Sequence, residues 1–302
     1  MPMFDIKLIF RPQLELAAKT VRKFSSVSFY ELSPLERTLL YFLYNGIVDS
    51  SEQIDCDCSL CALSALATRN PLYKGVTFQR RYPNNPYKYV FIFNGHRYSA
   101  DTLTSIWVPL KEIFLQNKDV QKLLNSNPEK NRWEVPQKER SKKTKDNKAI
   151  WADFILRHYD EFFSALPSDV KRALDKYHSL SNFFIVPENF NALWPTTREI
   201  NGVWRNNDCG DQKLLAIYDY FECRNNSSRN AAFLSTILDK NGKKVVDAWL
   251  DPYADWETFV RYNCLESYVN KDELYTIKQF SNTEVLRNLS DILSNDYDCL
   301  HE

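Results

Sequence analysis

The stretch VTFQRRYPNNPYKYVFIFNGHRYS, residues 76–99, decides the fold that we expect for this chain. Residues 76–82 and 87–93 are rich in aromatic and β-branched side chains, which is typical of strands. The PNNP sequence between them predicts a turn. Asn94-Gly95 then predicts a tight hairpin into a third strand over residues 96–98. The stretch therefore predicts a small antiparallel sheet.

The predicted sheet is basic and aromatic. From Cys58 to Ala100 the sequence contains no Asp or Glu, whereas Lys, Arg, Tyr and Phe are interleaved. Basic side chains neutralise phosphates, and aromatic rings stack on the bases of single strands. The candidate nucleic-acid contacts are therefore Arg80, Arg81, Lys88 and Arg97, together with Trp133 from a later basic segment.

The aromatic residues of the second predicted strand alternate along it. Tyr87, Tyr89, Phe91 and Phe93 share one face by the period of two. This pattern fits a stacking platform, and it also fits a face buried in the core. The apolar residues between them favour the core, because a strand buried on both sides is apolar on both faces.

Two other segments carry clear helix signals. Ser33-Pro34-Leu35-Glu36 is a capping box with proline at the first helical position, and it predicts a helix that ends at Asn45-Gly46. Residues 102–125 also have a helical pattern, and Pro109 predicts a kink within it. Helical patterns dominate the second half of the chain.

The two halves of the chain carry opposite charge. Residues 1–148 contain 23 Lys and Arg against 15 Asp and Glu, and residues 149–302 contain 16 against 24. We expect an α+β protein with a basic domain over residues 1–125, a basic linker over 126–148 and a mainly helical acidic domain over 149–302. The small antiparallel sheet and its flanking helices lie in the basic domain. The charges fit an anionic partner for the first half, and they also fit packing of the halves against each other.

Three cysteines precede the sheet in the sequence DCDCSLC, residues 55–61. Structural zinc takes four Cys or His ligands, and Cys56, Cys58, Cys61 and His96 would form a Cys3His set. The layout resembles a zinc ribbon that lacks its second CxxC pair, and the resemblance implies a structural zinc ion. In the alternative interpretation, the cysteines pack as small apolar side chains.

Arg172 and His178 stand six residues apart in a predicted helix. Their spacing resembles the R-x(4–6)-H motif of HEPN-type ribonucleases, which are helical domains that cleave RNA at a dimer interface without a metal. The resemblance implies that His178 acts as the general acid or base and that Arg172 stabilises the phosphorane. The alternative is an amphipathic helix without catalytic function.

Residues 183–280, which include FFIVPENFNALWPTTREINGVWRNN and DPYADWETFVRYNCLESYV, resemble the C-terminal part of an uncharacterised bacterial family, a domain of unknown function. The resemblance implies a bacterial or mobile-element origin and no particular activity. The polar segment of this stretch contains Trp194, Arg198, Asn201 and Arg205. These residues also suit a packed, hydrogen-bonded turn.

The composition argues against membrane proteins and against proteins with glycine-rich phosphate-binding loops. No apolar run reaches the roughly 20 residues of a membrane span, so we expect a cytoplasmic protein without membrane contact. Glycine-rich phosphate loops are absent from the sequence. The leading expectation is a non-enzymatic binding protein whose N-terminal half contacts nucleic acid or another anionic partner. The alternatives are a metal-independent HEPN-like ribonuclease and a protein–protein interaction module.

Overall fold

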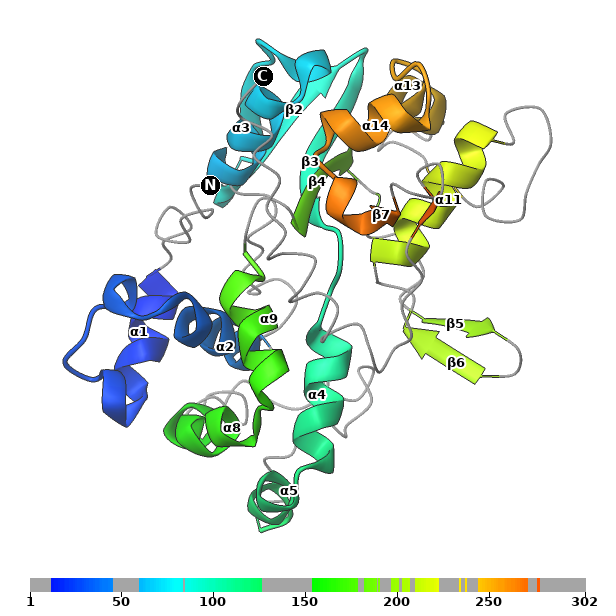
Figure 1. Cartoon of the computed structure of the whole chain (residues 1–302). Coiled ribbons are helices and arrows are strands. Elements are labelled where there is room, and N and C mark those ends of the chain that lie inside the picture. The colour runs from blue at the N-terminus through cyan, green and yellow to red at the C-terminus, as the bar shows by residue number, and fades with distance from the viewer. Residues whose placement is uncertain are drawn as a thin grey trace. The chain divides into compact units, whose positions relative to one another are not determined.

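The structure is a computed structural model, and the expected α+β class is confirmed by a four-stranded antiparallel sheet together with many helices (Figure 1). The residues that it describes are 12–45, 60–83, 85–126, 154–178, 182–188, 190, 197–200, 203–206, 210–222, 234, 237, 244–270 and 276–277.

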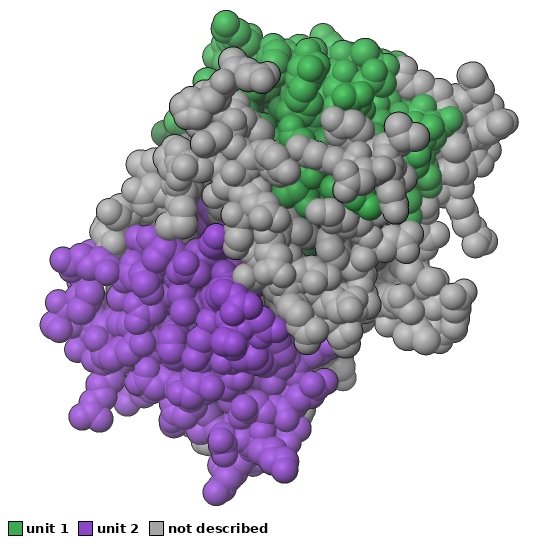
Figure 2. Space-filling view, viewed as in Figure 1, with its two compact units in different colours: residues 1–4, 55–105, 179–302 green, residues 5–54, 106–178 purple. Residues whose placement is uncertain are grey.

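The chain divides into two compact units, each built from segments that are far apart in the sequence (Figure 2). Unit 1 comprises Met1–Phe4, Asp55–Ser105 and Ser179–Glu302, and unit 2 comprises Asp5–Ile54 and Ile106–His178. This division differs from the expected boundary at 126–148, because a strand that follows this segment pairs with a strand that precedes it. Residues 127–148 themselves lie outside the described residues.

The sheet of unit 1 has the strand order β1-β2-β3-β4. Its strands are β1 (Phe78–Tyr82), β2 (Asn85–Phe93), β3 (His96–Thr102) and β4 (Phe183–Pro187). The predicted hairpin between β2 and β3 is confirmed: Asn94 and Gly95 have φ angles of 49° and 77°. These positive values match a type I′ turn, whose twist suits two antiparallel strands.

The remaining elements of unit 1 surround this sheet or form separate short hairpins. The helical elements are α3 (Leu60–Arg69), η4 (Pro71–Tyr73), α11 (Gly210–Glu222), α13 (Val246–Leu250), α14 (Trp256–Tyr262) and η7 (Glu266–Tyr268). The separate hairpins are β5 (Thr197–Ile200) with β6 (Val203–Asn206), and β7 (Val269–Asn270) with β8 (Thr276–Ile277).

One face of the sheet is covered by an aromatic cluster. The Tyr73 ring of η4 packs against Phe91, Phe93 and Tyr98, with ring centroids 5.1, 5.1 and 6.0 Å away. Phe91 and Tyr98 are opposite each other across β2 and β3, and both are fully buried. The alternating aromatic residues of β2 thus contribute to the core at Phe91. The expectation that β2 is buried on both sides holds for Val90 but not for Ile92, which is exposed on the other face.

A buried polar network holds Tyr73 in this position. The Asn70 side-chain amide donates to the Tyr253 hydroxyl oxygen at 2.9 Å and to Asn263 Oδ1 at 3.2 Å. The Tyr253 hydroxyl donates in turn to the Tyr73 hydroxyl oxygen at 3.3 Å. Because every member is buried and hydrogen-bonded, the network ties α3 and η4 to the segment around α14.

The two edges of the sheet differ. At β4, the Trp249 indole N–H of α13 donates to the Ile185 carbonyl at 3.2 Å, and all five residues of β4 are buried. At the other edge, β1 pairs with β2, and no other described strand pairs with its outer side. Among the strands that the structure describes, β1 is therefore an edge strand.

Unit 2 is helical in its described part. It contains α1 (Pro12–Thr20), η2 (Arg22–Phe24), η3 (Phe29–Glu31), α2 (Pro34–Asn45), α4 (Trp107–Gln116), α5 (Lys118–Asn125), α8 (Tyr159–Ala165) and α9 (Ser168–Lys176). The predicted kink at Pro109 is wrong. Pro109 lies in the first turn of α4, where a missing N–H has no intrahelical partner to lose. The helix instead breaks at Asn117, whose side chain accepts from the first N–H groups of α5.

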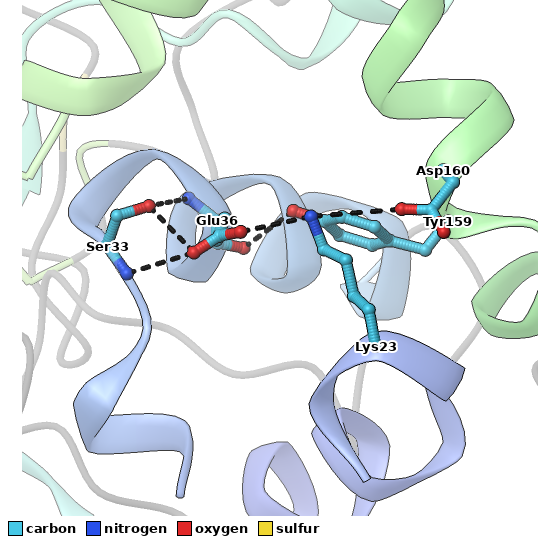
Figure 3. A network of polar contacts seen from close by, with 5 residues as sticks. All are labelled: Lys23, Ser33, Glu36, Tyr159 and Asp160. Carbon is cyan, nitrogen blue, oxygen red and sulfur yellow. Dashed lines mark hydrogen bonds and ion pairs between the residues drawn. The ribbon is translucent and has the colours of Figure 1, made fainter. Parts of the chain in front are cut away.

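The predicted capping box of α2 is confirmed and extends into a larger network (Figure 3). Glu36 accepts from the Ser33 backbone N–H at 3.2 Å, and the Ser33 hydroxyl accepts from the Glu36 N–H at 3.3 Å. Lys23 Nζ lies 3.0 Å from Glu36 Oε1 and 4.9 Å from the centre of the Tyr159 ring. Lys23 Nζ also lies 3.8 Å from Asp160 Oδ1, so Lys23 connects η2, α2 and α8 through two ion pairs and cation–π contacts.

Candidate nucleic-acid interface

The four predicted basic contacts of the sheet occupy different environments. Arg80 is exposed on β1, whereas Arg81, Lys88 and Arg97 are half-buried. Trp133, the fifth predicted contact, lies outside the described residues. The structure thus places all four basic residues on the β1–β3 strands, but it does not leave them equally accessible.

Arg81 and Arg97 are both engaged by the carboxylate of Glu188, which directly follows β4. Arg81 Nε lies 3.1 Å from Glu188 Oε1, and Arg97 Nε lies 2.8 Å from Oε2. Arg81 also donates to the Glu188 carbonyl at 3.0 Å, and Arg97 donates to the Arg81 carbonyl at 3.0 Å. The three side chains are between 10% and 18% exposed, so they form a largely buried ion-pair cluster that joins β1 and β3 to the end of β4.

Arg80 and Lys74 are the more accessible basic residues. Both are exposed, and no hydrogen bond or ion pair of either side chain is found within the described part of the chain. Tyr82 lies two residues beyond Arg80 and is 49% exposed. Exposed cations and an exposed aromatic ring on one strand and the segment before it are the groups that an anionic, base-bearing polymer needs.

The predicted zinc ligands are described only in part. Cys56 and Cys58 lie outside the described residues, and Cys61 is described by its backbone in α3. His96 begins β3 opposite Phe93 and is half-buried. Within the described residues, no three His, Cys, Asp or Glu side chains converge to hold a metal ion. The zinc site therefore stays a prediction.

Arg172 and His178 do not form a common site within unit 2. Arg172 is exposed on α9, whereas His178 is buried just beyond the end of that helix. His178 Nδ1 lies 3.1 Å from the Thr38 hydroxyl oxygen of α2, and its ring packs edge-on against Tyr41. Burial, with the nearby positive charge of Arg37, lowers the pKa of His178 to about 3. A buried neutral imidazole of this kind is placed for packing rather than for contact with RNA.

His178 makes stability depend on pH. Its pKa is about 3 when folded and 6.5 ordinarily, so its contribution is complete above pH 6.5 and is lost as pH falls toward 3. At pH 5 the loss is about 2 kcal/mol. We expect the wild type to lose about 2 kcal/mol more unfolding free energy than His178→Asn when the pH is lowered from 7.5 to 5. Urea unfolding at the two pH values measures this difference. Equal pH dependence in the two proteins would show that His178 is not the responsible group.

A buried ion pair that the sequence did not indicate lies next to the sheet. Lys213 of α11 and Asp101 of β3 have side chains that are 1% and 2% exposed, and Lys213 Nζ lies 3.2 Å from Asp101 Oδ2. Lys213 also donates to the Thr102 carbonyl at 2.9 Å. Glu188 was missed in the same way. Neither acid carries a signal in the sequence that marks it as buried, because a sequence shows a carboxylate but not the cation that pairs with it.

Within residues 183–280, Arg198 and Arg205 occupy opposite positions in the β5–β6 hairpin. Their side chains, and Trp194 and Asn201 entirely, lie outside the described residues. None of the helices that the structure describes is both long and apolar enough to cross a bilayer. No protein-family model, curated protein or solved structure matches this chain.

Proposed function

We propose that this chain is a non-enzymatic binding protein that holds nucleic acid against the β1–β2 hairpin, with Arg80 and Lys74 contacting phosphates. The observation that carries the proposal is the charge of this surface. The sequence from Cys58 to Ala100 has no acid, and its two exposed cations are Lys74, which precedes β1, and Arg80, which lies on β1.

The chemistry of the surface favours a polyanion over a small acidic ligand. A phosphate backbone repeats its charge along its length, so it contacts several separated cations at once, whereas a small anion needs a closed pocket of converging donors. Arg80 and Lys74 are both exposed, and neither is described as part of a closed pocket. Binding of this kind is weakened by salt and is tolerant of base sequence.

The neighbouring arginines of β1 provide a matched pair of variants. Arg80→Ala removes an exposed cation, so we expect weaker binding, a salt slope lower by about 1, and unfolding free energy within about 0.5 kcal/mol of the wild type. Arg81→Ala leaves Glu188 with one partner fewer, so we expect a loss of about 1–3 kcal/mol of stability. Urea unfolding and fluorescence anisotropy with a labelled oligonucleotide measure both effects.

The two arginines separate binding from folding because they are adjacent in sequence and differ in environment. If Arg80→Ala binds like the wild type at low salt, Arg80 does not contact phosphate and the proposed surface is wrong. If the wild type binds no oligonucleotide at all, the proposed function is wrong, and a protein partner becomes the better interpretation of the charged surface.

A further inference from the structure

Tyr82 ends β1 at the unpaired edge of the sheet, and 49% of its surface is exposed. Exposed aromatic residues of this size are uncommon in the described residues, and Phe91 of β2 and Tyr98 of β3 are instead buried in the core. The position of Tyr82 beside Arg80 raises the question of what its exposed ring contacts.

The ring is held in place from one side. The guanidinium carbon of Arg81 lies 5.4 Å from the centre of the Tyr82 ring, within the range of a cation–π contact. Arg81 is itself fixed by its ion pair with Glu188 and by its hydrogen bond to the Glu188 carbonyl. Glu188 thus fixes Arg81, and Arg81 restricts the ring, so little further ordering is needed when a ligand binds.

The charge around Tyr82 selects the kind of ligand. The charged side chains of β1 and β2 are all basic, and the only described acid beside them, Glu188, is already shared by two arginines. An exposed ring on such a surface suits a ligand that combines negative charge with flat apolar groups. Unpaired nucleotides have both, and stacking on an aromatic side chain is how single strands are bound without sequence preference.

We propose that Tyr82 is a stacking platform for one unpaired base, so that the ligand is single-stranded nucleic acid. This rests on the proposed function and adds the class of ligand to it. In a duplex both faces of each internal base are covered by neighbouring bases, so the ring has no face to stack on. Duplex can still contact Arg80 and Lys74 through its phosphates.

The test compares a labelled single-stranded oligonucleotide of about 12 nucleotides with the duplex of the same sequence, by fluorescence anisotropy at low salt. Tyr82→Ala should weaken single-strand binding roughly 5- to 150-fold, the effect of losing one base–aromatic stack, and should change duplex binding less than about twofold. Tyr82→Phe should restore most of the single-strand affinity, because it restores the ring without the hydroxyl.

Tyr262 supplies a matched control. The adjacent Arg261 guanidinium carbon lies 5.5 Å from the Tyr262 ring centre, a distance similar to that of Arg81 and Tyr82, but the pair belongs to α14 and Tyr262 is half-buried. Tyr262→Ala should leave both affinities unchanged. An equal loss for single strand and duplex with Tyr82→Ala, or no loss for either, would overturn the stacking role. If Arg80→Ala still weakens binding in that case, the proposed function stands without the platform.

Discussion

Replacing Lys213 with methionine is expected to lower the free energy of unfolding by about 3–5 kcal/mol, as loss of one member of a buried ion pair does. The methionine has a similar length but no charge, so the Asp101 carboxylate remains buried without its cation. The Thr102 carbonyl also loses a donor. Urea unfolding monitored by circular dichroism and tryptophan fluorescence measures the change.

Most of the expected loss of stability comes from leaving the buried Asp101 carboxylate without a cation, and less of it comes from losing the contact with Lys213. Asp101→Asn combined with Lys213→Met removes that charge while nearly preserving shape. The double variant should therefore be more stable than Lys213→Met alone, and the two substitutions should not be additive. Additive effects would show that Lys213 and Asp101 act independently, in contradiction to the distance of 3.2 Å between them.

Phe91→Ala is expected to destabilise the protein by about 3–5 kcal/mol, because it removes a fully buried ring and leaves a cavity. Phe91 stacks on Tyr98 with ring centroids 5.5 Å apart, and its other neighbours include Tyr73 and Phe78. The neighbouring Ile92→Ala is the matched control. Ile92 is 52% exposed on the opposite face, so its loss should cost about 0.5 kcal/mol. Unfolding in urea measures both variants.

This pair of variants decides between the two interpretations of the aromatic residues of β2. If Phe91→Ala unfolds at nearly the same urea concentration as the wild type but loses affinity for an oligonucleotide, then the stripe is a binding surface and the described packing is wrong. The expected outcome is the reverse, with a large loss of stability and unchanged affinity of the folded protein.

The features that could be predicted from the sequence are local ones. Asn94-Gly95 specifies its turn through its own backbone preferences, and Ser33 with Glu36 specifies a helix start through two reciprocal hydrogen bonds. The alternation along β2 placed Phe91 on one face, although it did not show that Tyr73 covers that face. Local chemistry predicts an element, whereas the neighbour that buries it comes from elsewhere in the chain.

The features that could not be predicted join distant segments. Nothing near residues 183–187 signals that this strand completes a sheet begun at Phe78, so the expected division of the chain followed composition instead. Arg81 and Arg97 were treated as equivalent to Arg80, because a sequence shows a cation but not the carboxylate that Glu188 brings to it. The structure places the four predicted basic residues on β1, β2 and β3 and separates them by accessibility, which the sequence alone did not show.

The central claim is that exposed cations on the β1–β2 hairpin hold a nucleic acid through its phosphates. The most direct test titrates the wild type with a labelled single-stranded oligonucleotide over a series of salt concentrations. With about two phosphate contacts, from Lys74 and Arg80, the logarithm of the binding constant should fall linearly with the logarithm of salt concentration, with a slope of about −1.4. The double variant Lys74→Ala/Arg80→Ala should show almost no slope. Salt-independent binding, or no binding at low salt, would contradict the account.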